Sequence, residues 1–144
     1  MKRTSFAKEE CPIARSLDTV GDWWALLIVR DAFTGKKRFG EFQTSLGVAK
    51  NILTVRLKKL VADGVLEMVP ASDGSAYKEY VLTEKGRGLL LVLVALGQWG
   101  CGESEFALVD RKKGKRVQLE LRSEDGRKLD LADVQLVPAP APVE

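Results

Sequence analysis

Apolar residues recur at helical spacing on both sides of Gly47, in the most regularly patterned part of the chain. They lie three or four positions apart, as Phe39, Phe42 and Leu46 before the glycine and as Leu53, Leu57 and Leu60 after it. Each stripe predicts a helix that buries one face. We therefore expect a short helix over 39–46, a tight turn at Gly47, and a longer helix that begins at residue 48 or 49 and ends at Asp63.

The remaining face of the longer helix is polar and positively charged. It is formed by side chains at steps of four positions and by two flanking neighbours: Lys50, Thr54 and Lys58, with Asn51 and Arg56 beside them. Such a face suits a helix that lies in the major groove of DNA, where cations meet phosphates and short polar side chains reach base edges. The spacing alone is equally consistent with an ordinary solvated helix face.

Two expected strands, separated by turn-forming residues, follow this helix. Residues 66–69 and 77–82 predict the strands, and the segment 70–76 is dense in proline, serine, aspartate and glycine. A helix-turn-helix followed by a two-stranded hairpin is the winged-helix arrangement, in which the hairpin tip lies along the DNA backbone or in the minor groove. Asp73 and Gly74 mark the expected tip, and Ser75 and Lys78 are candidate phosphate contacts.

The residues upstream predict two more helices and a basic loop. Pro12 introduces a helix over 14–20, and the segment 23–33 is apolar on nearly its whole circumference until Arg30, as expected of a helix at the centre of a core. A run of three cations then precedes the helix-turn-helix: Lys36, Lys37 and Arg38. We favour phosphate contact for this run over the alternative of a solvated loop.

A third long helix is expected after the hairpin, capped by Thr83 with Glu84 in its first turn. Every residue from 89 to 96 is apolar, although a membrane span needs about 20 such residues. A small domain cannot cover such a helix on all sides, so we predict that one face meets a second copy of the chain. The candidate dimer residues are Leu89, Val92, Leu93, Leu96 and Trp99.

Composition and charge narrow the function classes. Residues 1–102 carry 15 basic and 11 acidic residues, a net charge of +4, whereas residues 103–144 carry 8 and 9, a net charge of −1. This balance permits DNA binding but does not require it. The chain has no histidine and no glycine-rich phosphate loop after a strand, so we predict neither an enzyme nor a metal or cofactor site. The polar amino terminus and two distant cysteines favour a cytoplasmic protein without a secretory signal.

Six short motifs, in this order, resemble those of the HxlR-type transcription regulators. They are CPIAR at 11–15, VGDWWALLIVRD at 20–31, RFGEF at 38–42, LGVA at 46–49, LTVRL at 53–57 and LTEKG at 82–86. The resemblance covers residues 11 to about 102. It implies a small bacterial winged-helix homodimer, related in architecture to the MarR group. Trp23 departs from the pattern, because family members commonly carry Lys or Arg there.

The resemblance also implies a mode of action. The dimer would form through the terminal helices and bind an inverted repeat in double-stranded DNA with the helix from residue 49 to residue 63. Repression is the expected outcome, since a dimer on a promoter occludes polymerase, and activation is the alternative. A dimeric interaction module that has lost DNA binding is the competing function. Salt-dependent retention on DNA would separate the two.

The resemblance directs attention to Cys11, because several similar regulators carry an oxidant-sensing or electrophile-sensing cysteine just before this proline. The start of a helix and the nearby Arg15 would favour a thiolate, whereas Glu9 and Glu10 would oppose it. In a dimer, Cys11 of one subunit could approach Cys101 of the other. A redox or small-molecule effector and a merely structural thiol both remain open.

The tail differs from the rest of the chain. Alternating segments at 106–110, 117–121 and 128–131, with Gly114 and Gly126 between them, predict a short strand meander. We expect an α+β protein with three parts: a winged helix-turn-helix domain with terminal dimerisation helices at 1–102, a β-rich appendage at 103–137, and a proline-rich end at 138–144 that does not fold.

Overall fold

The computed structural model describes residues 5–8, 10–100 and 107–138. Its contacts divide the chain into two compact units, Met1–Leu96 and Gly97–Glu144, and each is described by itself. The expected boundary at residues 102 and 103 lies outside the described residues, as do Glu9, Cys101 and most of the proline-rich end. The three-part division therefore stays a prediction.

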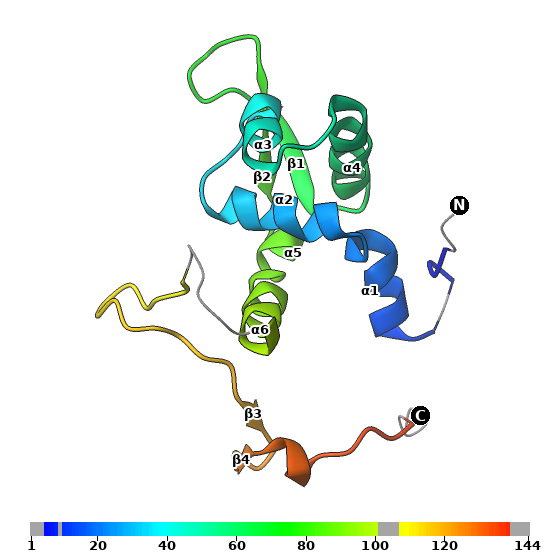
Figure 1. The fold of residues 1–144 in the computed structure, drawn as a ribbon, viewed down its shortest axis with the longest axis vertical. Coiled ribbons are helices and arrows are strands. Elements are labelled where there is room, and N and C mark those ends of the chain that lie inside the picture. Colours follow the sequence, from blue (N-terminus) through cyan, green and yellow to red (C-terminus); the bar gives the residue numbers. More distant parts are fainter. Residues whose placement is uncertain (1–4, 9, 101–106, 139–144) are drawn as a thin grey trace. The chain divides into compact units, whose positions relative to one another are not determined.

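The first unit is a winged helix-turn-helix domain, as predicted (Figure 1). Its elements are α1 Pro12–Val20, α2 Trp23–Phe33, α3 Phe39–Leu46, α4 Lys50–Ala62, β1 Leu66–Pro70, β2 Lys78–Leu82, α5 Glu84–Arg87 and α6 Leu90–Gly100, the last of which runs into the second unit. The elements from α1 to β2 follow the expected order along the chain. Figure 1 shows α3, α4 and the loop of the hairpin at the end of the domain away from α6.

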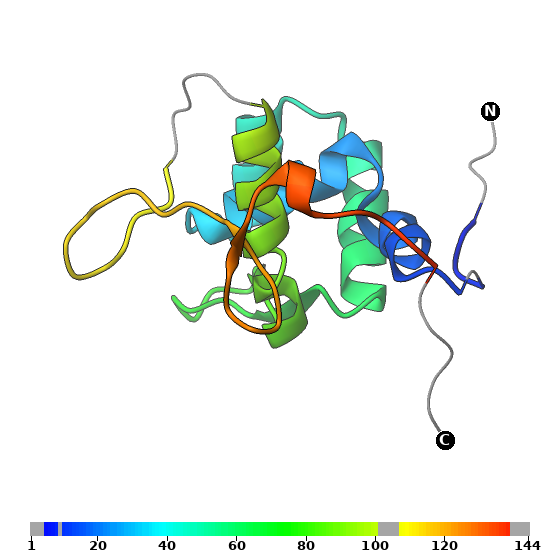
Figure 2. The same ribbon diagram turned by 90° about the horizontal axis from the view of Figure 1, so that it is seen from below.

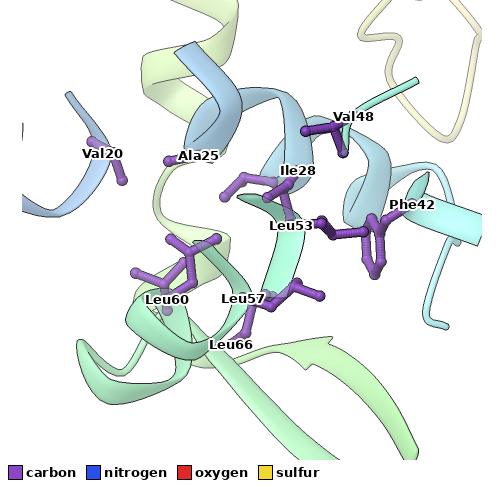
Figure 3. Close-up of a cluster of buried hydrophobic side chains, with 11 residues drawn as sticks. Val20, Ala25, Ile28, Phe42, Val48, Leu53, Leu57, Leu60 and Leu66 are labelled. Carbon is purple, nitrogen blue, oxygen red and sulfur yellow. The ribbon is translucent and has the colours of Figure 1, made fainter. Parts of the chain in front are cut away.

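The core forms where the two predicted stripes meet α2. Leu53, Leu57 and Leu60 of α4 are buried together with Phe42 of α3 and Ile28 of α2 (Figure 3). Gly47 adopts φ +63°, a left-handed conformation that ends α3 and turns the chain into α4. The helix-turn-helix thus places one left-handed glycine between a partly buried stripe on α3 and a buried stripe on α4.

Helix α2 lies at the centre of the domain, as expected, and contacts α1, α3, α4 and β2. Asp22 caps it by accepting a hydrogen bond from the Ala25 N–H at 2.9 Å. Trp23, however, is 80% exposed, so the side chain that departs from the family pattern lies at the surface and adds nothing to the core. Asp31 is buried at the other end and pairs with Arg30 at 3.1 Å.

Strands β1 and β2 are antiparallel, with Leu66 opposite Leu82 and Pro70 opposite Lys78. The N–H of Tyr80 in β2 also donates a hydrogen bond to the Lys37 carbonyl at 2.7 Å. The predicted basic loop therefore continues the hairpin's hydrogen bonding on its other side.

The expected third long helix is wrong as a single element, because the chain forms a short α5 and a separate α6. Thr83 does cap the first of these, accepting a hydrogen bond from the Gly86 N–H at 3.0 Å. The chain then makes a tight turn in which the Leu89 N–H donates to the Gly86 carbonyl at 3.1 Å. Gly86 is buried against Val65, just before the hairpin begins. This close contact holds α5 against the hairpin, and the turn to α6 follows directly after it.

The second unit is less regular than predicted. Its strands β3 Leu121–Arg122 and β4 Lys128–Leu129 pair antiparallel, and Leu131–Asp133 forms a single 3-10 turn. Val109 and Arg116 form an isolated bridge that closes a separate hairpin, seen as the yellow loop in Figure 2. Only Leu121 of the predicted strand at 117–121 is in a strand, so the meander is reduced to two small hairpins within the described part of the tail.

Candidate nucleic-acid interface

Four of the five predicted side chains lie on the outer face of α4. Lys50, Asn51 and Lys58 are exposed. Thr54 is half-buried, and its hydroxyl donates to the Lys50 carbonyl at 2.8 Å, which leaves the oxygen free to accept a hydrogen bond. These residues form a continuous strip, as the spacing predicted.

The structure places Arg56 on a different side of α4. Its Nε lies 3.3 Å from the Asp22 carboxylate, so the guanidinium joins α4 to the cap of α2. One exposed residue of the outer face was missed, because it is apolar: Val55 is 57% exposed. Its position four residues after Asn51 was the available signal, and its methyl groups could contact a thymine methyl group in the major groove.

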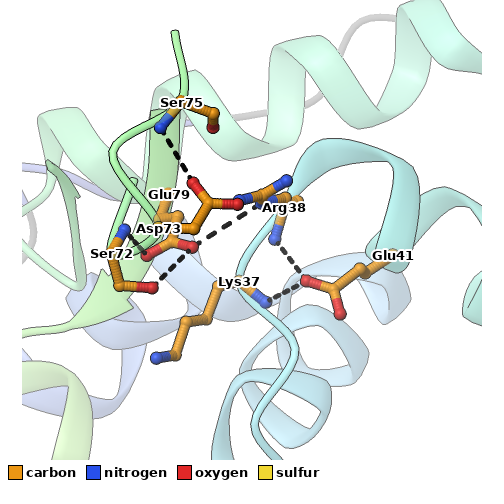
Figure 4. Close-up of polar contacts among 7 residues, drawn as sticks. All are labelled: Lys37, Arg38, Glu41, Ser72, Asp73, Ser75 and Glu79. Carbon is orange, nitrogen blue, oxygen red and sulfur yellow. Dashed lines mark hydrogen bonds and ion pairs between the residues drawn. The ribbon is translucent and has the colours of Figure 1, made fainter. Parts of the chain in front are cut away.

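A polar cluster around Arg38 joins the N-terminal end of α3 to the tip of the hairpin (Figure 4). We call this cluster, formed by Arg38, Asp73, Tyr77, Glu79 and Ser72, the wing clasp. The Arg38 guanidinium donates a hydrogen bond to the Asp73 carboxylate and lies 3.6 Å from the Glu79 carboxylate. It also lies 5.2 Å from the centre of the Tyr77 ring, within the range of a cation–π contact. Glu79 is buried and accepts hydrogen bonds from the N–H and hydroxyl of Ser72 at 3.0 and 3.3 Å.

Two carboxylates around the clasp have lowered pKa values. The backbone N–H and side chain of Ser75, followed by Arg38, hold the pKa of Asp73 well below its usual range. Hydrogen bonds from the backbone N–H groups of Arg38 and Lys37 lower the pKa of Glu41. Both carboxylates are therefore ionised at neutral pH. The Asp73 carboxylate joins the hairpin tip to Arg38 by a charge-assisted contact, whereas the Glu41 carboxylate holds the backbone at the start of α3.

The clasp changes the roles available to the basic loop. Arg38 is already engaged by two carboxylates, and the Lys36 ammonium lies 3.3 Å from the Thr34 hydroxyl. Lys37 and Lys78 are exposed. Ser75 is half-buried, and its N–H donates to Asp73 at 3.0 Å. Within the described residues, Lys37 and Lys78 are thus the cations of this region best placed for phosphate contact.

The predicted dimer stripe is divided by the structure. Leu89 and Leu93 are partly buried and pack against the core of their own subunit. Val92, Leu96 and Trp99 are 41%, 46% and 86% exposed. Part of the stripe therefore covers the core of its own subunit and part is left exposed, a division that the spacing of the leucines could not reveal.

Cys11 is exposed and occupies the cap position before α1. The Arg15 N–H donates to the Cys11 carbonyl at 3.0 Å, so the backbone of Cys11 begins the hydrogen bonding of the first turn of α1. The described residues contain neither a group of three or more histidine, cysteine, aspartate or glutamate side chains fit to hold a metal ion, nor a helix long and apolar enough to cross a membrane.

Comparison with known proteins places this geometry in a family. The model of the HxlR-like helix-turn-helix family matches residues 19–106. Among curated relatives, the uncharacterized HTH-type transcriptional regulator Rv3095 of Mycobacterium tuberculosis is 44% identical over 88 residues. The match covers 61% of this chain and 56% of Rv3095, so the chain spans little more than half the length of that relative.

Two solved structures extend the comparison. PA1607, described as a candidate transcription factor, is 50% identical with a TM-score of 0.83, over 94% of this chain and 100% of its own. HypR, described as a redox regulator in its reduced form, is 32% identical with a TM-score of 0.57, over 62% of this chain and 90% of its own. The family model matches more than half of this chain, and the chain forms the winged helix. This chain therefore belongs to the HxlR-like helix-turn-helix family.

Proposed function

We propose that this protein is a sequence-specific DNA-binding regulator of transcription that acts as a homodimer on an inverted-repeat operator. The observation that carries the proposal is the exposed polar strip on α4, whose Lys50, Asn51 and Lys58 stand on a helix held by three buried leucines. A rigid helix with such a face fits the major groove. The family assignment and the relatives named as transcriptional regulators support the same function.

Repression is the proposed outcome, because a dimer bound at a promoter excludes polymerase. The proposed partner, chromosomal DNA, places the protein in the cytoplasm of a bacterium. Family and relatives point to a regulator and not to an enzyme.

Base contacts and phosphate contacts should respond differently to substitution. Asn51→Ala and Thr54→Ala should each cost about 1 to 3 kcal/mol on the operator and little on random DNA, because base-edge contacts exist only at the correct site. Lys58→Ala and Lys78→Ala should weaken both alike. Selection of bound genomic fragments would supply the operator, and titrations of both duplexes would measure the losses. Equal losses on operator and random DNA for Asn51→Ala would contradict the assignment of α4 as the base-reading helix.

The homodimer rests on the exposed part of α6. Val92 and Leu96 present apolar surface that their own subunit leaves uncovered, and burying it against a second copy would be favourable. Leu96→Asp is the sharper test, since Leu93→Asp would place a charge against the subunit's own core. We expect Leu96→Asp to be a folded monomer that no longer binds an inverted repeat. A wild-type protein that sediments as a monomer at micromolar concentration would refute the dimer.

We propose Cys11 as a thiol sensor, on two grounds. HypR, which this chain resembles, is described as a redox regulator and has been solved in reduced and oxidized forms, and Cys11 is exposed beside a helix start. Oxidation by diamide should then change operator binding in wild type but not in Cys11→Ser, and dithiothreitol should reverse the change. Unchanged binding in both proteins would leave Cys11 as a structural thiol.

A winged-helix module without DNA binding is distinguished by salt. Phosphate contacts release counterions, so a DNA-binding protein loses affinity steeply as the salt concentration rises. No retention on DNA at low salt would reject the proposed function in favour of the interaction module.

A further inference from the structure

The second unit contains a well-formed hairpin from Leu108 to Val117. The Val117 N–H donates to the Leu108 carbonyl and the Asp110 N–H to the Lys115 carbonyl, both at 2.9 Å. The Asp110 carboxylate accepts hydrogen bonds from the backbone N–H groups of Lys113 and Lys115 at 2.6 and 3.1 Å. One aspartate therefore organises the whole turn, so its side chains project from a defined backbone.

This turn carries an unusual concentration of positive charge. Five of the six residues from 111 to 116 are cations, and all five are exposed: Arg111, Lys112, Lys113, Lys115 and Arg116. Within the described ranges of the chain, none of the five forms an ion pair with a carboxylate. Asp110 offsets one charge and leaves a net charge of about +4 on the hairpin.

The neighbouring hairpin of the same unit provides the contrast. Arg122 and Lys128 lie 2.7 and 3.9 Å from the Glu120 carboxylate, and Arg127 lies 2.9 Å from Asp125. Each of these three exposed cations thus lies beside a carboxylate, whereas the five exposed cations at 111–116 do not. The unpaired charge is a property of one hairpin and not of the tail as a whole.

We propose that the hairpin at 108–117, which we call the basic hairpin, is a second DNA contact that binds backbone phosphates without reading sequence. Clustered Lys and Arg side chains displace condensed counterions from DNA, and each such contact contributes to affinity at low salt. An ordered turn loses less conformational entropy on binding than a disordered basic tail. The inference rests on the proposed DNA-binding function and adds a contact outside the part of the chain, 19–106, that matches the family model.

An anionic lipid surface is the main competing partner for a basic cluster. Surface-seeking segments combine cations with apolar side chains that enter the acyl region. The tip residues 110–116 contain only aspartate, arginine, lysine and glycine, and the exposed valines of the hairpin, Val109 and Val117, lie at its paired base and not at the tip. The tip therefore offers no apolar side chain for insertion. DNA is the favoured partner for this reason.

The test compares wild type with a variant in which all five cations of the basic hairpin are changed to glutamine, leaving Asp110 and Gly114 in place. Both are titrated with a random-sequence duplex of about 30 base pairs, three helical turns, at several salt concentrations. We expect the variant to bind about tenfold or more weakly at 0.1 M salt and to lose about two or more units of salt slope, since each phosphate contact accounts for about 0.9. The double variant Lys112→Gln/Lys113→Gln, which perturbs the turn less, should lose an intermediate amount.

The matched control is the triple variant Arg122→Gln/Arg127→Gln/Lys128→Gln in the neighbouring hairpin. It removes three charges from the same unit but should change the salt slope by less than one, because those cations are already paired. A basic-hairpin variant with the wild-type slope, or with a loss equal to that of the control, overturns the inference. If the basic-hairpin variant binds DNA as wild type does but binds vesicles containing phosphatidylglycerol more weakly, the inference is overturned in favour of a membrane partner.

Failure of the inference is distinguishable from failure of the proposed function. Lys58→Ala lies on α4, outside the basic hairpin, and probes the winged helix separately. If Lys58→Ala reduces the salt slope and the hairpin variant does not, the winged helix binds DNA and the basic hairpin does not. If wild type shows no salt-dependent binding to DNA at all, the proposed function itself is wrong.

Discussion

Gly86 is a position where the addition of a single methyl group should lower the stability of the fold. It lies in α5, where Ala is the better helix former and would ordinarily stabilise the protein by about 0.5 to 1 kcal/mol. In this structure a β-carbon there would lie well under 3.0 Å from the Val65 carbonyl oxygen and 3.1 Å from a methyl group of Leu82. The nearest obstacle is backbone, which cannot move aside as a flexible side chain can.

Three contributions determine the expected loss of stability. Overpacking of a close contact costs about 1 to 3 kcal/mol. The Val65 carbonyl also accepts hydrogen bonds from the Thr83 N–H at 3.1 Å and the Thr83 hydroxyl at 3.2 Å. Displacing it therefore weakens the cap of α5, which is worth about 1 kcal/mol. The third contribution, the better helix propensity of Ala, acts in the opposite direction. In total, Gly86→Ala should lower the free energy of unfolding by about 1 to 3 kcal/mol.

Thermal and urea denaturation at one fixed protein concentration measure the effect. For a unit of this size, about 1 to 3 kcal/mol corresponds to a fall in Tm of roughly 5 to 20 °C. Gly40→Ala is the matched control, because Gly40 lies in α3 and its β-carbon would meet nothing within 4 Å. Gly40→Ala should leave stability unchanged or raise it by up to about 1 kcal/mol. If Gly86→Ala is as stable as wild type, α5 does not pack closely against the hairpin and the reasoning is refuted.

Further predictions concern the ion pairs. Asp73→Asn should weaken DNA binding although it removes a negative charge, because it releases the hairpin tip from Arg38. A titration with operator DNA measures this change, and tighter binding would show that Asp73 acts only by repulsion. Since the pKa of Asp73 is lowered in the fold, its stabilising contact is present above the ordinary carboxyl pKa and is lost as pH falls through the lowered value. An NMR titration of Asp73 should accordingly find it ionised at about pH 4. Arg56→Gln should lower stability and leave the salt slope of DNA binding unchanged, because Arg56 pairs with Asp22; a slope reduced by about one would instead make Arg56 a phosphate contact.

Much of the winged helix followed from local pattern alone. Phe39, Phe42 and Leu46 repeat at the helical period, and Gly47 follows where a left-handed residue is needed, so two helices and their turn could be placed without any long-range contact. The hairpin followed in the same way from turn residues between two strand-like runs. These elements are determined by neighbours within a few positions, which is the distance over which a sequence pattern carries information.

The sequence alone therefore determined the fold class, the family resemblance and the polar strip on α4, because periodicity and short motifs are local. The tertiary structure decided which cations are free. Arg38 and Arg56 resemble Lys37 and Lys58 in the sequence, but their carboxylate partners lie 35 residues away at Asp73 and across the fold at Asp22. It also decided the break after α5, since the contact between Gly86 and Val65 joins segments that only folding brings together. Partners distant in the chain leave no periodic trace, so packing alone could assign these roles.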